Sequence, residues 1–91
     1  MKRAEAECQI TNELGLHLRA AAAFVKLAEE FKSDVKLVCD GMVANGKSII
    51  AIVTLAAAKG TSVRIVAEGP DAEAAVGALE TLVADGFGES S

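Results

Sequence analysis

The chain has very few aromatic residues: no tryptophan, no tyrosine and three phenylalanines among 91 residues. Platforms on which nucleic-acid bases could stack are therefore nearly absent. The nine basic residues are scattered among thirteen acidic ones, so the net charge is −4 and no basic stripe is formed. These features exclude nucleic acid as a partner, and the acidity favours partners with basic surfaces.

Cysteine and histidine are as scarce as the aromatic residues. Cys8 and Cys39 are the only cysteines, and two isolated cysteines do not make a disulfide framework. His17 is the only histidine, which leaves a zinc site short of ligands. Motifs for a metal or a dinucleotide are also missing, so we expect neither a metal nor a cofactor. We expect both cysteines to be buried free thiols, which are typical of a reducing compartment.

Long hydrophobic runs are missing as well. No stretch approaches the length that spans a bilayer, and the N-terminus lacks the charged-then-apolar form of a signal peptide. We therefore expect a cytoplasmic protein without membrane insertion. Hydrophobic residues make up 52% of the chain, enough for the core of one small domain. We expect this domain to cover residues 1–88, followed by a frayed tail at 89–91.

What the chain does contain is an ordered succession of strand and helix patterns. Alternating apolar residues predict strands, the Asp40-Gly41 pair predicts a hairpin, and helical spacing of apolar residues predicts helices. The predicted strands are 3–10, 35–39, 42–44 and 62–68, and the predicted helices are about 17–31, 49–58 and the stretch after Gly69-Pro70-Asp71. Because each element has one apolar face, the order β-α-β-β-α-β-α predicts an α+β open-faced sandwich, with a four-stranded antiparallel sheet covered on one face by three helices.

The apolar residues of the second and third predicted helices indicate which face of each helix is buried. In the second helix we expect Ile52, Leu55 and Ala56 to face the sheet, and Lys59-Gly60 to end the helix. Its remaining apolar residues, Ile49, Ile50 and Val53, either form a docking surface or enter the core through the helix register. In the third helix the expected buried stripe is Ala75, Ala78, Leu79 and Leu82.

His17 is the main candidate for chemistry, because it follows a glycine turn and opens the first predicted helix. A helix N-terminus offers unpaired N–H groups and the positive end of the dipole, which bind phosphate. Arg19 adds a fork of charged donors, and an imidazole can act as a nucleophile. This combination indicates a group that carries phosphate on histidine. The alternatives are a solvated or capping histidine, or the base of a small hydrolase.

Ser48 precedes the second predicted helix, where a serine caps the first turn. A phosphate on this serine would also be tolerated by the helix dipole. Ser48 is therefore either a cap alone or a cap that is also a phosphorylation site.

Several of these segments resemble one family. Gly15-Leu16-His17-Leu18-Arg19-Ala20-Ala21-Ala22 resembles the active-site signature of HPr, the histidine phosphocarrier of the bacterial sugar phosphotransferase system. Asn45-Gly46-Lys47-Ser48-Ile49-Ile50 resembles the segment that opens that family's second helix. Phe24-Val25-Lys26, Lys59-Gly60 and Glu68-Gly69 also match, and the ending Asp85-Gly86-Phe87 is similar to the nitrogen-branch paralogue, NPr.

The resemblance implies a phosphoryl carrier rather than an enzyme with turnover. His17 would accept phosphate on Nδ1 from phosphorylated enzyme I, itself charged by phosphoenolpyruvate, and pass it to a histidine of a IIA protein. Arg19 would steady the phosphoryl group, and Ser48 matches the serine that a dedicated kinase modifies in some bacteria. The expected partner-binding residues are Leu18, Ile49, Ile50 and Val53, and we expect a monomer.

The chain departs from the family pattern beside His17. The family has His-Ala-Arg-Pro-Ala, whereas Leu18 replaces the first alanine here and Ala20 replaces the proline. A proline in the first turn fixes φ and removes a donor, so Ala20 restores an N–H group that a phosphate could use. The rival interpretation is a regulatory module of the same fold that signals by binding; the presence of both His17 and Arg19 favours the carrier.

Overall fold

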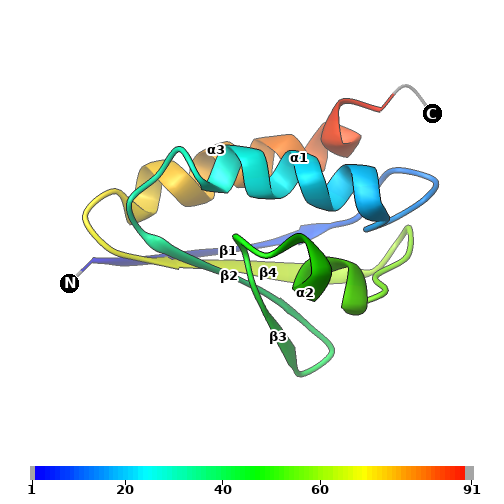
Figure 1. Cartoon of the computed structure of the whole chain (residues 1–91), viewed down its shortest axis with the longest axis horizontal. Coiled ribbons are helices and arrows are strands. Elements are labelled where there is room, and N and C mark those ends of the chain that lie inside the picture. The colour runs from blue at the N-terminus through cyan, green and yellow to red at the C-terminus, as the bar shows by residue number, and fades with distance from the viewer. Residues whose placement is uncertain (1, 90–91) are drawn as a thin grey trace.

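The computed structural model describes residues 2–89 and contains a four-stranded antiparallel sheet with helices packed on one face (Figure 1). The strands are β1 (Arg3–Gln9), β2 (Asp34–Cys39), β3 (Met42–Asn45) and β4 (Ser62–Glu68), and the helices are α1 (Leu18–Ala28), α2 (Ile49–Thr54) and α3 (Ala72–Ala84). The strand order in the sheet is β1-β4-β2-β3. The predicted element order and fold class are confirmed.

The strands place alternate residues in the core, as a period of two requires. Cys8 of β1 lies opposite Val63 of β4, and Leu37 of β2 lies opposite Ile65 of β4. The side chains of Val63, Leu37 and Ile65 are buried. They belong to the same core cluster as Phe24 of α1, which is fully buried. Strands β2 and β3 form the predicted hairpin. Asp40 and Gly41 between them have the positive φ values of a two-residue turn.

The first helix is shorter than the sequence predicts. It ends at Ala28 instead of Phe31, and the chain then tightens into a turn in which Phe31 N–H donates to the Ala28 carbonyl. The carboxylate of Asp71 holds the following turn by accepting from the Ser33 hydroxyl and from the Lys32 and Ser33 N–H groups. The Ser33 hydroxyl bond, and then the bond from the Lys32 N–H, lower the pKa of Asp71. This turn directs the chain into β2.

The second helix also ends early, at Thr54 instead of residue 58. Ala56 has a φ of +53°, so it leaves the helical path, and it is exposed instead of facing the sheet. Ile52 and Leu55 are buried as predicted. Lys59 does not lie at a helix end; its Nζ instead pairs with Glu13 at 2.5 Å. The apolar pattern therefore extends beyond the helix because the residues after it pack against the loop at 11–16.

The third helix and the tail differ from the prediction in detail. Ala75 and Leu79 are buried as predicted, but Val76 and Val83 complete the buried face, while Ala78 and Leu82 are only half-buried. After α3 the segment Gly86–Gly88 forms a short 3-10 turn. Glu89 was predicted to begin a frayed tail, but hydrogen bonds from Asn12 and His17 hold it in place. Ser90 and Ser91 lie outside the described residues.

Two further findings concern residues 2–89 only. None of the helices there is long and apolar enough to cross a membrane. That part of the chain also contains no group of three or more His, Cys, Asp or Glu side chains placed to hold a metal ion.

Candidate functional site

The loop before α1 positions His17 through tight contacts with the segment after α2. Gly15 has a φ of +64°, and a Cβ atom there would lie 2.4 Å from the carbonyl oxygen of Ala57. A larger residue therefore cannot take this place without moving the backbone. The Leu16 N–H donates to the same oxygen at 2.9 Å, and Asn12 Nδ2 donates to the Gly15 carbonyl at 2.8 Å. The residue that starts the helix is thus attached to a rigid loop.

His17 is the N-cap residue of α1. Its backbone is extended, with φ −77° and ψ 178°, and its carbonyl accepts the N–H of Ala21 at 2.9 Å. Its ring atom Nδ1 accepts the N–H of Arg19 at 3.3 Å. Nδ1 therefore lies at the open end of the helix, beside N–H groups of the first turn and at the positive end of the dipole.

The other ring nitrogen faces a carboxylate from the end of the chain. His17 Nε2 lies 2.5 Å from Oε2 of Glu89, and the two side chains are 24% and 12% exposed. Oε1 of Glu89 accepts from Asn12 Nδ2 at 2.9 Å. The bond from Asn12, the bond from His17 and the charge of Arg19 lower the pKa of Glu89, against the desolvation by burial, which raises it. The carboxylate is therefore ionised at neutral pH.

The hydrogen bonds assign the protonation of the neutral ring. A backbone N–H can only donate, so Nδ1 must offer its lone pair to Arg19. An ionised carboxylate can only accept, so Nε2 must carry the proton that is shared with Glu89. Both contacts select the same tautomer, with the proton on Nε2 and the lone pair on Nδ1. The nitrogen at the helix end is therefore the nucleophilic one.

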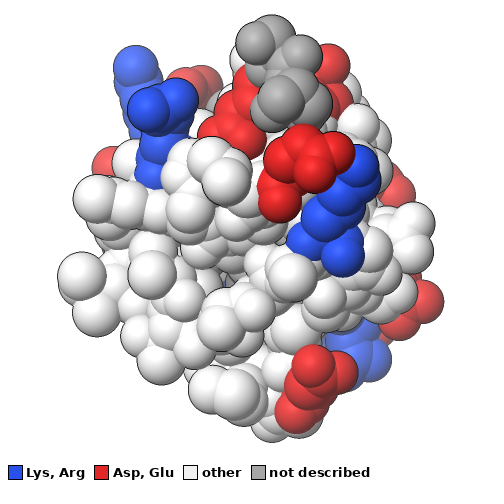
Figure 2. Space-filling model, turned by 90° about the vertical axis from the view of Figure 1, so that its right-hand side faces the viewer, with Lys and Arg blue, Asp and Glu red and all other residues white. Residues whose placement is uncertain are grey.

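The predicted partner-binding residues differ in exposure. Leu18 and Ile50 are 64% and 74% exposed, whereas Ile49 and Val53 are half-buried against the core. Leu14, which the sequence analysis did not single out, is 69% exposed. Figure 2 views the end of the molecule that holds the loop at 11–16; uncharged side chains fill its centre and left, and the charged ones lie mainly in its upper and right parts. Large apolar side chains are therefore exposed on the loop before His17, at the start of α1 and on α2, which packs against α1.

The two remaining predicted site residues, Arg19 and Ser48, lie in different environments. The side chain of Arg19 is exposed, and its charge acts on Glu89. Ser48 caps α2, because its hydroxyl accepts the N–H of Ala51 at 3.3 Å. The preceding Lys47 donates to the Phe31 carbonyl at 2.8 Å and thereby connects this cap to the turn that follows α1.

Asn12 and Glu89 belong to the site although no sequence pattern predicted a role for either. Glu89 is 72 residues away from His17 along the chain and 77 from Asn12. No local spacing connects such residues. The only available signal was the polar side chain of Asn12 next to the glycine turn, which by itself is typical of an ordinary loop.

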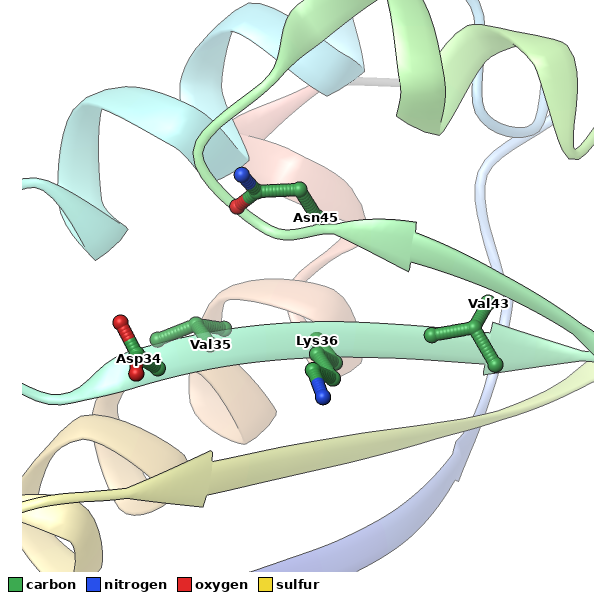
Figure 3. Close-up of a pocket in the computed structure, with 5 residues that line it drawn as sticks. All are labelled: Asp34, Val35, Lys36, Val43 and Asn45. Carbon is green, nitrogen blue, oxygen red and sulfur yellow. The ribbon is translucent and has the colours of Figure 1, made fainter.

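A surface hollow of about 240 Å³ lies elsewhere, along β2 and β3 (Figure 3). Its lining residues are Asp34, Val35, Lys36, Val43 and Asn45. None of these side chains forms a hydrogen bond or an ion pair with His17 or Glu89. This hollow is therefore separate from the histidine site.

Comparison with known proteins identifies the family. The family model described as "PTS HPr component phosphorylation site" matches residues 4–85. The chain belongs to the HPr family. The phosphocarrier protein HPr of Cupriavidus necator is 44% identical to it over 80 residues, which are 88% of this chain and 90% of that protein.

Solved HPr structures have the same fold. A crystal structure of HPr-C-His from Thermoanaerobacter tengcongensis has a TM-score of 0.91 at 40% identity and covers 97% of this chain and 99% of its own. A second crystal structure from that organism, of an HPr dimer, has a TM-score of 0.76 at 41% identity and covers 90% and 94%. HPr proteins are phosphocarriers of the phosphotransferase system. The resemblance found in the sequence is thereby confirmed.

Proposed function

We propose that this member of the HPr family carries a phosphoryl group on Nδ1 of His17, taking it from phosphorylated enzyme I and passing it to a IIA protein. The observation that supports the proposal is the placement of Nδ1, whose lone pair lies at the open start of α1 on a partly exposed ring. N–H groups of the first turn, including that of Ala20, would donate to the phosphoryl oxygens. The Arg19 guanidinium would add a charged contact.

The transfer itself requires no proton movement on His17. The Nδ1 lone pair attacks phosphorus, the P–N bond to the donor's phosphohistidine breaks, and its electron pair returns to the donor nitrogen. In the second transfer a histidine nitrogen of the IIA protein attacks the phosphorus, the Nδ1–P bond breaks, and its electron pair returns to Nδ1. His17 is then neutral again. The protein is consumed and regenerated within the relay and has no turnover of its own.

Docking would use the exposed apolar residues around the site. Leu18 and Ile50 are the most suitable contacts because both are more than half exposed, and Ile49 and Val53 would contribute the edges that the core leaves accessible. We also propose that the protein works as a monomer in the cytoplasm, and that a serine kinase acting on Ser48 could regulate docking from beside Ile49 and Ile50.

Labelled phosphoenolpyruvate and enzyme I test the carrier function. The parent protein should take up one acid-labile, base-stable phosphoryl group, and His17→Ala should take up none, because the chain has no other histidine. Ser48→Ala, which leaves the histidine intact, is the matched control and should still be labelled. An unlabelled parent, or a labelled His17→Ala variant, would contradict the proposal.

A further inference from the structure

We propose that Glu89 is a positioning residue for phosphoryl transfer: it holds the proton of His17 on Nε2 and thereby keeps the reactive lone pair on Nδ1. This inference rests on the proposed carrier function. It starts from the contact between His17 Nε2 and Glu89 Oε2 at 2.5 Å, which joins the active histidine to the end of the chain.

The backbone before Glu89 is shaped to return the tail to the start of α1. Gly86, Phe87 and Gly88 all have positive φ values, between 60° and 77°, which reverse the chain direction. The Phe87 side chain is buried, although a positive φ is unfavourable for an aromatic residue. The Glu89 N–H donates to the Gly86 carbonyl at 3.1 Å. A buried anchor and a closed turn therefore fix the backbone position of Glu89.

Asn12 fixes the carboxylate itself. Its Nδ2 group donates one hydrogen bond to Glu89 and one to the Gly15 carbonyl. Its Oδ1 has no hydrogen-bond partner among the described residues. Turning the amide over would direct Oδ1 against two acceptor oxygens, so this orientation is the favourable one. Because Gly15 also belongs to the loop that positions His17, one side chain sets the carboxylate relative to the ring.

The carboxylate suits both states of the ring. In the free protein it accepts the Nε2 proton, which leaves only Nδ1 with a lone pair. When the Nδ1–P bond forms and the donor P–N bond breaks, Nε2 keeps its proton and the ring gains positive charge. Glu89 lies against that charge and would stabilise it. Such a carboxylate–imidazole pair fixes both the tautomer and the ring orientation.

The first part of the test examines the free protein and needs no phosphoryl donor. Nitrogen-15 NMR of the ring is unambiguous because the chain has one histidine. The parent should show one pyridine-like nitrogen, Nδ1, and one protonated nitrogen, Nε2. Glu89→Ala removes the acceptor and should shift both signals towards a mixture of tautomers, whereas Glu89→Gln, which keeps a neutral acceptor, should lie between them. Asp85→Asn removes a charge from an exposed side chain of the same tail and should match the parent.

The second part measures the rate of phosphorylation with two donors, phosphorylated enzyme I and the small molecule phosphoramidate. Because phosphoramidate does not dock on the apolar surface, it reports the reactivity of the ring itself. With both donors Glu89→Ala should react about ten- to a hundredfold more slowly than the parent, the effect expected from losing one hydrogen bond to a charged group. Asp85→Asn should react at the parent rate, and the thermal midpoint of unfolding should be similar in all variants.

The outcomes separate the two proposals. If the parent is not phosphorylated by enzyme I, the carrier function is wrong. If the parent reacts and Glu89→Ala keeps the parent tautomer, or reacts as fast as or faster than the parent, the positioning role of Glu89 is wrong. A mixed tautomer together with slower reaction in Glu89→Ala alone supports it.

Discussion

At the scale of single residues, His17 presents its two ring nitrogens to two different environments. Nδ1 meets the N–H of Arg19 at the start of a helix, and Nε2 meets the carboxylate of Glu89. One nitrogen is therefore available to an electrophile while the other retains a proton. Arg19 lies next to this pair and has an exposed guanidinium, which leaves it available for an incoming anion.

Replacement of Arg19 tests that assignment. Arg19→Ala should fold normally, because the side chain is exposed, and should slow phosphoryl transfer by roughly tenfold, the loss of one charge-assisted contact. Arg19→Lys should recover part of the rate, since a point charge does not reproduce the planar fork. The measurement is transfer from enzyme I under single-turnover conditions, with Lys26→Ala as a control that removes an exposed cation from the same helix. A parent-like rate for Arg19→Ala would exclude a role in transfer.

At the scale of elements, α1 and α2 both begin with a side chain that accepts from their first turn. In α1 the acceptor is the imidazole of His17, and in α2 it is the hydroxyl of Ser48. The two helices pack against each other, so both starts belong to the same helical layer. The short α2 carries the exposed Ile50 next to its own cap.

Changes at Ser48 should separate capping from regulation. Ser48→Ala should lower the free energy of unfolding by about 1 kcal/mol through the lost cap, with transfer nearly unchanged. Ser48→Asp can still cap the helix, but it places a negative charge beside Ile49 and Ile50 and should slow transfer from enzyme I. Urea unfolding and the transfer assay measure the two effects. Equal transfer by Ser48→Asp and the parent would show that this serine acts only as a cap.

Ile50 and Ile52 provide a matched pair on the same helix, one exposed and one fully buried. Ile50→Glu should leave the thermal midpoint nearly unchanged and weaken binding to enzyme I or a IIA protein, because it places a charge on the docking surface. Ile52→Ala should cost about 2–5 kcal/mol of unfolding free energy by leaving a cavity. Thr81→Glu, on the exposed side of α3, controls for the added charge and should bind normally. A large loss of stability in Ile50→Glu would contradict the docking assignment.

At the scale of the whole molecule, the sheet and the helices bury Cys39, whereas Cys8 is only half-buried instead of buried as predicted. Burial, followed by the charges of Glu80 and Glu7, raises the pKa of Cys8 to about 11. Burial, followed by the charge of Asp40, raises the pKa of Cys39 as well. In the unfolded chain the same thiols would ionise near their ordinary pKa of about 8.5. The folded state therefore retains protons that the unfolded state loses in alkaline solution.

This difference predicts the pH dependence of stability. Below about pH 8.5 the thiols are protonated in both states, and as the pH rises towards 11 only the unfolded chain ionises, so the free energy of unfolding should fall. Urea unfolding followed by circular dichroism at about pH 7 and about pH 10 measures the decrease. The double variant Cys8→Ala, Cys39→Ala should show a smaller decrease than the parent. An equal decrease in both proteins would mean that other groups cause it.

The sequence by itself determined the features that depend on neighbouring residues. Alternation predicted the strands, Asp40-Gly41 predicted the hairpin, and Ser48 was correctly predicted to cap a helix. The motif around His17 was sufficient to indicate the family, whereas the reaction at Nδ1 of His17 stays a prediction. These signals are local because side-chain direction, turn conformation and capping are set within a few residues.

Only the tertiary structure decided where α2 ends and what lies against His17. The carbonyl of Ala57 accepts a hydrogen bond from the Leu16 N–H instead of continuing a helix. The helix therefore ends at Thr54, although the apolar pattern of the sequence continues beyond it. Glu89 reaches the imidazole across 72 residues because the turn at Gly86–Gly88 packs Phe87 into the core. Contacts of this kind have no sequence period, since they arise from how separate elements pack and not from the conformation of any one of them.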